Sequence, residues 1–201
     1  MNIAILGSGN IGRTLGKKWA AAGHQITFGA RNPGDPKYDN LLNQSNMQVA
    51  TIEAAVGTCQ TLLLAIPGSA VSIRLSQIRL MLAEKIIIDA TNQVGQAEMN
   101  SFAAITAAAP NAKVYRAFST LGWENFETPQ IKGQQLDLFY CGDEGQSKTI
   151  VEALITDIGL HPIYLGNREQ VGTVDGLTKL WFALVFGQGY GRRLAFKMLT
   201  E

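Results

Sequence analysis

The sequence contains few of the residues that build metal sites, disulfide frameworks and nucleic-acid-binding surfaces. Its 201 residues include only two histidines and two cysteines, and Cys59 and Cys141 lie far apart without a C-x-x-C spacing. This usage predicts buried thiols in a reducing compartment and no bound metal. The formal net charge is only +1, which gives no support for a nucleic-acid or membrane-surface partner.

Long hydrophobic runs are also missing. No stretch approaches the length of a membrane span, and no basic segment precedes the short apolar run at residues 3–6. We therefore expect no membrane segment and no signal peptide, and a cytoplasmic location. A chain of 201 residues, 46% of them hydrophobic, is long enough for one domain with a substantial core and short for two. We expect a single domain over residues 1–201.

The N-terminus contains a glycine-rich turn between a predicted strand and a predicted helix. The apolar run at residues 3–6 is followed by Gly7, Ser8, Gly9, Asn10, Ile11 and Gly12. A helix is expected over residues 10–22 and a second strand over residues 25–30. This order, with its G-x-G-x-x-G spacing, is typical of a dinucleotide-binding unit, in which the helix N-terminus binds the pyrophosphate. We expect these six residues to bind a dinucleotide.

The absence of acidic residues near this motif favours one cofactor. NAD-binding sites place Asp or Glu at the end of the second strand, where it binds the ribose 2′-hydroxyl. Here that strand is followed by Ala30, Arg31 and Asn32, and the first acidic residue of the chain is Asp35. A guanidinium group is suited to a 2′-phosphate. The sequence therefore predicts NADP(H) rather than NAD(H).

The rest of the chain alternates strands and helices. We expect strands at residues 47–50, 61–66, 85–90, 113–118, 136–141 and 161–165, and helices at residues 38–44, 52–56, 70–83, 98–109 and 147–158. Residues 121–135 are expected to form a long irregular loop. The fold class is therefore α/β, a doubly wound (Rossmann) parallel sheet in residues 1–165, followed by a C-terminal helical segment in residues 166–201.

Ligands of such sheets bind where the parallel strands end. Small or polar residues occupy the expected strand ends and extend the predicted cofactor site: Ala65, Ile66, Pro67, Thr91, Asn92 and Ala117. These ends contain no obvious general acid or base, so we assign no catalytic residue; hydride transfer does not require one, because the cofactor carries the chemistry. Asp89 is expected to be a hydrogen-bonded supporting group rather than an acid with a shifted pKa.

Four other side chains are expected to be structural. His24 is interpreted as a turn residue and His161 as a structural residue at a strand start. Trp181 is expected in the core or in a dimer interface. Arg192 and Arg193 are expected to form a solvated surface rather than to bind an anionic substrate.

Several segments together resemble one known family. ILGSGNIG, FGARNP, AIP, DATN, YRAFSTLGWENF, YCGDEGQSK and GRRLAFKMLTE occur in this order. The chain thereby resembles the NADP-dependent oxidoreductases related to the coenzyme F-420 (deazaflavin):NADP reductases, to which the cytosolic domain of membrane metalloreductases is also similar. The resemblance implies hydride transfer between NADP(H) and a flavin-like or deazaflavin co-substrate. It also implies a nicotinamide near Ile66, Pro67, Asn92 and Ala117, and a homodimer formed through the C-terminal helical segment.

Three functions remain open at this stage. The first is an NADP(H)-dependent oxidoreductase with a small-molecule redox acceptor, which shares the cofactor's cleft because little sequence remains after the last strand. The second is an NADPH-binding sensor or accessory module without turnover. The third is a flavin-assisted ferric reductase. Where the family commonly has Ala-Phe-Asn-Thr, this chain has Ala-Phe-Ser-Thr, so Ser119 replaces an asparagine on the acceptor side.

Overall fold

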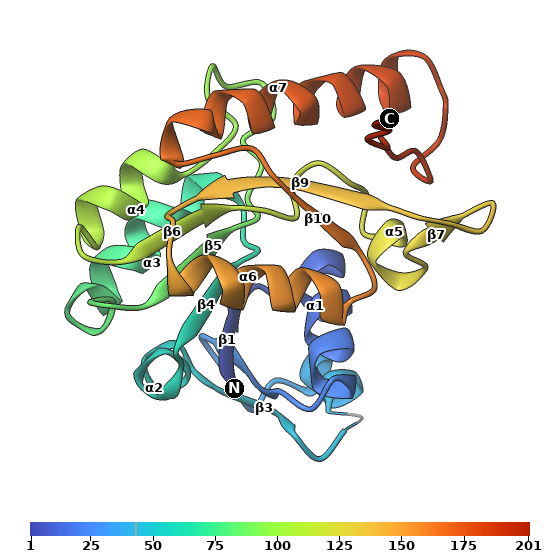
Figure 1. The fold of residues 1–201 in the computed structure, drawn as a ribbon. Coiled ribbons are helices and arrows are strands. Elements are labelled where there is room, and N and C mark those ends of the chain that lie inside the picture. The colour runs from blue at the N-terminus through green and yellow to red at the C-terminus, as the bar shows by residue number, and fades with distance from the viewer. Residues whose placement is uncertain (43) are drawn as a thin grey trace.

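An eight-stranded sheet forms the centre of the molecule, in the order β10-β9-β6-β5-β4-β1-β2-β3 (Figure 1). The structure is a computed structural model that describes residues 1–42 and 44–201. Its sheet strands are β1 (Asn2–Leu6), β2 (Gln25–Ala30), β3 (Met47–Thr51), β4 (Thr61–Leu64), β5 (Ile86–Asp89), β6 (Lys113–Arg116), β9 (Asp137–Gly142) and β10 (His161–Tyr164). A separate hairpin pairs β7 (Gln130–Ile131) with β8 (Gln134–Gln135).

The sheet is mostly parallel, and the predicted Rossmann-like α/β class is confirmed. Strands β3, β2, β1, β4, β5 and β6 run parallel to one another. In contrast to the expected fully parallel sheet, β9 pairs antiparallel with β6, and β10 follows the direction of β9. The reason is the connection from β6 to β9, which contains only a short helix and the hairpin, so the chain re-enters the sheet from the end at which β6 leaves it.

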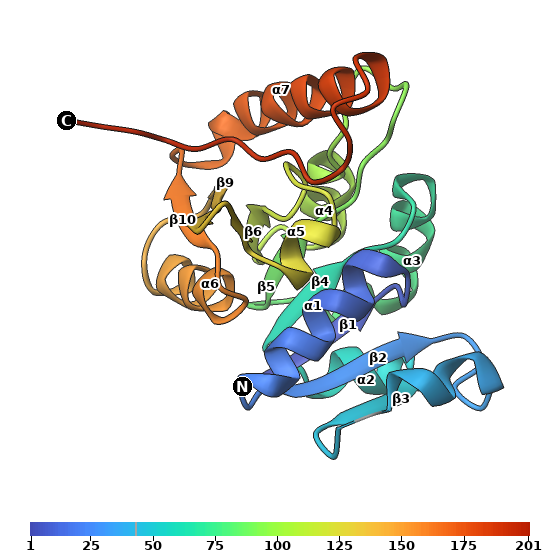
Figure 2. The same cartoon turned by 90° about the vertical axis from the view of Figure 1, so that its right-hand side faces the viewer.

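Helices cover both faces of the sheet (Figures 1 and 2). They are α1 (Asn10–Ala21), α2 (Ile52–Thr58), α3 (Val71–Ile78), α4 (Phe102–Ala108), α5 (Glu124–Glu127), α6 (Gln146–Asp157) and α7 (Val171–Phe182). Leu15 and Trp19 of α1 share one buried core with Leu154 of α6. The core of the other face combines α2, α3 and α4, with Leu75 and Ile105 among its buried residues. Helix α7 packs against β9.

Several predicted helices have different bounds in the structure. The helix expected over residues 98–109 begins only at Phe102, because side chains hold the preceding loop: Asp89 accepts a hydrogen bond from the backbone N–H of Ser101, and Asn100 accepts one from that of Phe102. The helix expected over residues 70–83 is α3 flanked by 3-10 turns. A 3-10 helix, Pro36–Leu41, replaces the helix expected over residues 38–44, of which residue 43 lies outside the described part of the chain.

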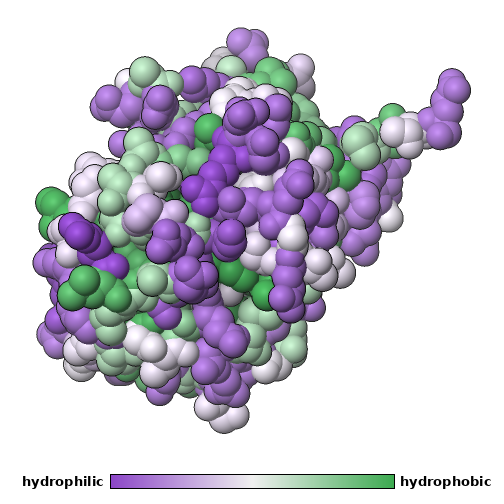
Figure 3. Space-filling view, turned by 60° about the vertical axis from the view of Figure 1, so that its left-hand side comes forward, coloured by the Kyte–Doolittle hydropathy of each residue, from purple (hydrophilic) through white to green (hydrophobic). Residues whose placement is uncertain are grey.

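Two connecting segments also differ from expectation. The segment 121–135, expected to be irregular, contains α5 and the β7–β8 hairpin. The C-terminal segment is helical only as far as a π-helical turn, Ala183–Gly187. Gly189 and Gly191 follow it with φ of +74° and +80°, values that favour glycine and end the helix. The last residues then extend away from the body, as Figures 2 and 3 show.

The surface in Figure 3 mixes hydrophilic and hydrophobic residues. Within residues 1–42 and 44–201, no helix is both long and apolar enough to cross a membrane.

Candidate functional site

The three glycines of the N-terminal turn have different surroundings. Gly7 has a φ of +116°, and a Cβ atom there would lie 2.2 Å from the carbonyl oxygen of Ala65. A Cβ on Gly12 would lie 2.0 Å from the carbonyl oxygen of Gly7, so this glycine allows α1 to pack against the turn. A Cβ on Gly9 would meet no atom within 4 Å. Gly7 and Gly12 are thus required by the fold, whereas Gly9 keeps a space open above the turn.

The N-terminus of α1 has the character of an anion site. Its N-cap is Gly9, which has no side chain to accept a hydrogen bond, and the first turn contains no acidic residue. The first N–H groups of a helix have no partner within the helix, and together with the helix dipole they favour a negatively charged group. The open space at Gly9 and these N–H groups fit the pyrophosphate of a dinucleotide.

A pocket of about 390 Å³ adjoins this turn. Six of the predicted cofactor-binding residues line it: Gly7, Ser8, Ala30, Arg31, Ile66 and Pro67. The other six lining residues, which include Tyr38 and Arg74, are not among those predicted from the sequence. The pocket therefore has two guanidinium groups in its wall, and none of its described lining residues is acidic.

The other predicted residues lie around this pocket without lining it. Gly9, Asn10, Ile11 and Gly12 form the end of the turn and the start of α1, and Asn32 follows Arg31. Ala65 packs beneath Gly7. Asn92 is half-buried in the loop after β5, whereas Thr91 and Ala117 are buried, so their side chains are not open to the pocket.

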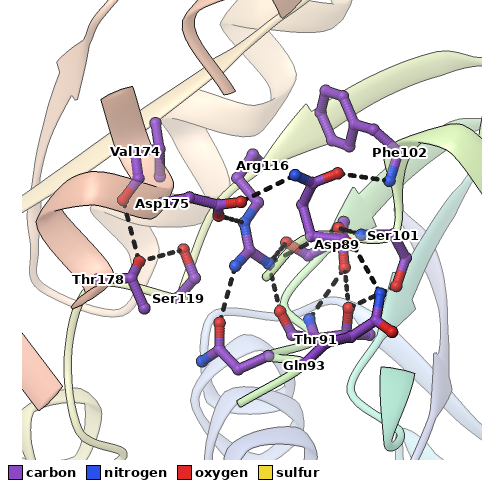
Figure 4. A network of polar contacts seen from close by, with 12 residues as sticks. Asp89, Thr91, Gln93, Ser101, Phe102, Arg116, Ser119, Val174, Asp175 and Thr178 are labelled. Atoms are coloured by element: carbon purple, nitrogen blue, oxygen red, sulfur yellow. Dashed lines mark hydrogen bonds and ion pairs between the residues drawn. The ribbon is translucent and has the colours of Figure 1, made fainter. Parts of the chain in front are cut away.

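A buried polar network lies beyond the ends of β5 and β6 (Figure 4). Arg116, the last residue of β6, is fully buried, and its Nε donates to Asp175 Oδ1 of α7 at 2.9 Å. Its other nitrogens donate to the backbone carbonyls of Asp89 and Thr91 and, at 2.7 Å, to Asn92 Oδ1. The local sequence does not predict this role, because Arg116 lies within a mostly apolar strand pattern.

Asp89 belongs to the same network, as a hydrogen-bonded group. Its Oδ1 accepts from the N–H and the hydroxyl of Thr91, at 2.9 and 2.6 Å, and its Oδ2 accepts from the N–H of Ser101 at 2.7 Å. The Nη1 of Arg116 lies 3.6 Å from Oδ2. The carboxyl oxygens are therefore occupied by the loop that follows β5, in agreement with the supporting role expected for Asp89.

The two histidines lie outside the 390 Å³ pocket and contact carboxylates. His24 Nε2 is 2.8 Å from Asp157 Oδ2, and His161 Nδ1 is 3.1 Å from Asp137 Oδ1. These contacts agree with the structural roles expected for both. Among the residues that the structure describes, no group of three or more His, Cys, Asp or Glu side chains is arranged to hold a metal ion.

Arg192 is half-buried and Arg193 is exposed, in agreement with the expected solvated surface, but both side chains also make contacts within the chain. Arg192 pairs with Glu124 and lies 5.6 Å from the centre of the Trp181 ring, while Arg193 donates to backbone carbonyls of the segment 124–130. Trp181 is buried, and its indole N–H donates to the carbonyl oxygen of Leu194 at 2.9 Å. Through these contacts, residues 192–194 of the C-terminal tail bind to α7 and to the connection between β6 and β9.

The fold and the glycine-rich turn are those of the Rossmann class, whose members commonly bind dinucleotides. Residues 2–93, which contain both the turn and Arg31, match the family described as NADP oxidoreductase, coenzyme F420-dependent. The match confirms the resemblance: residues 2–93 are similar to NADP-dependent oxidoreductases.

Three similar proteins illustrate this relationship. A candidate F420-dependent NADP-reductase from Arthrobacter sp. FB24 has a TM-score of 0.86 at 23% identity, with 100% of both chains covered. The reductive aminase of Aspergillus terreus, in complex with NADPH and ethyl-5-oxohexanoate, has a TM-score of 0.67 at 20% identity over 92% of this chain and 63% of its own. The metalloreductase STEAP3 of Rattus norvegicus is 26% identical over 180 residues. That alignment covers 87% of this chain but only 36% of the relative.

Proposed function

We propose that this chain transfers hydride between NADP(H) and a flavin-like or deazaflavin acceptor. The observation that supports NADP(H) most directly is the pocket beside the glycine-rich turn, which Arg31 and Arg74 line and whose described lining residues include no acidic one. The family description names both NADP and coenzyme F420. A bound nicotinamide would supply the hydride chemistry, and the protein has to bind, orient and shield it.

Each part of the site has one task in this proposal. The first turn of α1 binds the pyrophosphate above Gly9, and Arg31 pairs with the 2′-phosphate. The turn at Ile66 and Pro67, together with the loop at Asn92, orients the nicotinamide, since the cofactor of such sheets crosses the carboxyl ends of the strands. The acceptor is expected to be a flat ring system that reaches the same cleft.

The first experiment compares the binding of NADPH and NADH to Arg31→Ala. Loss of a charge-assisted pair should weaken NADPH by roughly 10- to 100-fold and leave NADH nearly unchanged. Arg13→Ala is a matched control, because Arg13 is exposed on α1 and does not line the pocket. Equal weakening of NADPH and NADH by Arg31→Ala would contradict the 2′-phosphate assignment.

The second experiment tests turnover. Loss of nicotinamide absorbance is measured with NADPH and a panel of flavins, a deazaflavin and small carbonyl compounds. Oxidation of NADPH by a flavin or deazaflavin is expected. Tight NADPH binding without turnover on any acceptor would contradict the proposal and favour the second candidate, an NADPH-binding sensor or accessory module.

A third candidate is a flavin-assisted ferric reductase, which the similarity to the metalloreductase STEAP3 favours. Reduction of ferric iron that requires both NADPH and added flavin would support it.

We further propose a homodimer that uses the C-terminal segment, since Leu180, Phe186 and Tyr190 are exposed there at 47%, 60% and 69%. The two free, buried cysteines are consistent with a cytoplasmic location.

A further inference from the structure

The side chain of Asn92 is held in one orientation by Arg116. Nη2 of Arg116 donates to Asn92 Oδ1 at 2.7 Å. A guanidinium group has donors only, so the amide atom that faces it must be the oxygen. In the described part of the chain, Nδ2 of Asn92 donates to no protein atom, so both of its N–H groups remain available to a ligand.

Arg116 is itself fixed from several sides and cannot readily turn away. Its Nε donates to Asp175 Oδ1 of α7, while Nη1 donates to the backbone carbonyls of Asp89 and Thr91. The second oxygen of Asp175 accepts from Asn100 Nδ2 at 2.8 Å. Figure 4 shows Arg116 between Asp175 on one side and the loop at Thr91 on the other. Such a network favours one arrangement of side chains, because a buried charge is strongly destabilised when its partner moves away.

The loop that contains Asn92 adjoins the wall of the cofactor pocket. A Cβ on Gly68 would lie only 2.1 Å from Cγ of Gln93, so the turn at Pro67 and Gly68 packs directly on this loop. Pro67 lines the 390 Å³ pocket. In the strand order, β5 follows β4 on the side away from β2 and Arg31, which is the side of the nicotinamide in a dinucleotide that crosses the sheet.

We propose that Arg116 is a positioning residue that presents the N–H groups of Asn92 to the nicotinamide carboxamide, and that Asp175 of α7 holds Arg116 in place. The carboxamide oxygen accepts from Asn92 Nδ2, which fixes the ring face that the acceptor meets. This inference rests on the proposed NADP(H) site. It also connects the C-terminal helix to the reacting end of the cofactor through two side chains.

The test uses two probes that differ only in the nicotinamide end: NADPH and 2′-phospho-ADP-ribose, which has no nicotinamide ring. In the full chain, Arg116→Lys keeps a buried cation but loses the planar fork that reaches both Asn92 and Asp175. We expect it to weaken NADPH about 5- to 10-fold, the effect of one hydrogen bond, and to leave 2′-phospho-ADP-ribose unchanged. A purely structural role would weaken both probes equally, which would overturn the proposal.

Asn92→Ala provides an independent variant, since Asn92 is half-buried and its truncation leaves Arg116 paired with Asp175. It should cause the same selective loss of NADPH affinity. If Arg116 acts through Asn92, the double variant Arg116→Lys with Asn92→Ala should bind NADPH no more weakly than Asn92→Ala alone. Unchanged NADPH affinity in Asn92→Ala, or additive losses in the double variant, would overturn the inference even where Arg116→Lys fails to fold.

This result is distinguishable from failure of the proposed function. If the NADP(H) site itself is wrongly assigned, neither probe binds the unmodified protein tightly. If only the acceptor is wrong, the selective loss of NADPH affinity is still observed without turnover.

Discussion

Gly7 and Ala65 are packed backbone against backbone, so that a Cβ on Gly7 would lie 2.2 Å from the carbonyl oxygen of Ala65. This contact joins the turn after β1 to the end of β4, the two strands between which the strand order reverses. The same turn leaves an open space only two residues later, at Gly9. One motif therefore contains a glycine that the packing of the fold requires and a glycine that this packing does not require, and substitution can separate them.

Gly9→Val is predicted to abolish cofactor binding without loss of stability. Gly9 has φ −71° and ψ −174°, which any residue adopts, and a Cβ there meets no protein atom within 4 Å. Its side chain would occupy the space proposed for the pyrophosphate, so NADPH and NADH should both weaken by about 100-fold or more. Isothermal titration and thermal unfolding measure the two effects. Tight binding of either dinucleotide by Gly9→Val would place the pyrophosphate elsewhere.

Gly7→Ala is the matched comparison, and in contrast to Gly9→Val it should lower the stability of the fold. At φ +116° an alanine is strained, and its Cβ would collide with Ala65, so we expect a loss of stability of several kcal/mol. A Gly7→Ala protein that unfolds at the same denaturant concentration as the unmodified chain would contradict the close packing of Gly7 against Ala65.

Arg74→Ala is predicted to reduce the preference for NADPH over NADH. Arg74 lines the same pocket as Arg31 and comes from α3, a different crossover of the fold. Two cations near one phosphate should each contribute, so we expect about 10-fold weaker binding of NADPH. Arg79→Ala, which changes an exposed arginine outside the pocket, is the control. Equal weakening of NADH would instead place Arg74 against the adenosine that both dinucleotides share.

Asp137 should make the attachment of the C-terminal tail dependent on pH. Burial alone would raise the pKa of Asp137, but hydrogen bonds from Lys197, the N–H of Met198 and His161 outweigh it and hold the pKa below its ordinary value. A carboxyl group with a lowered pKa in the folded state stabilises that state above its unfolded pKa, about 4, and loses this contribution as the pH falls through its folded value. We therefore expect constant tail protection near neutral pH and faster cleavage of the tail below about pH 4, measured at each pH with a protease that is active there.

Asp137→Asn isolates this effect. The variant cannot ionise at residue 137, so the tail should already be cleaved faster at neutral pH, and the additional step below about pH 4 should be absent. Identical pH profiles for the two proteins would assign the acid sensitivity to another group.

Both thiols are predicted to be unreactive in the folded protein. Burial raises the pKa of Cys141 to about 12, and it also raises the pKa of Cys59. Because the thiolate is the reactive species, a thiol reagent at pH 8 should label neither cysteine until denaturant unfolds the chain. Rapid labelling of one thiol in the native protein would show that its environment opens locally.

The N-terminal half of the fold was predictable because local signals agree with the tertiary structure. Strand β2 has the predicted bounds, and α1 ends one residue before its predicted end, since apolar spacing and Gly23 mark these limits. Thr51 caps α2 by accepting from the N–H of Ala54, a local interaction that threonine favours just before a helix. The pocket residues from Gly7 to Arg31 follow from the same motif.

The missed features depend on contacts between segments that are distant in sequence. Arg74 has the spacing of a solvated helix residue, and only the placement of α3, which packs against α2 and α4, brings it to the pocket. Arg116 follows a tyrosine within a strand, and its partner Asp175 is 59 residues away. The reversal of β9 depends on the hairpin in the segment 121–135, whose two-residue strands have no clear periodicity.

Trp19→Phe tests the packing of α1 against α6. Trp19 is fully buried, its indole N–H donates to the carbonyl oxygen of Leu154 at 2.8 Å, and its ring meets that of Phe118 edge-on at 5.7 Å. Phenylalanine removes the donor and part of the volume, so the free energy of unfolding should fall by about 1–3 kcal/mol in denaturant titrations. Trp123→Phe, at a half-buried tryptophan, should cost less than about 1 kcal/mol. The hydrogen bond to Leu154 joins α1 to α6, so weaker NADPH binding in Trp19→Phe but not in Trp123→Phe would show that the proposed pyrophosphate site depends on the position of α1. Equal stability of the two variants would contradict the role of the hydrogen bond to Leu154.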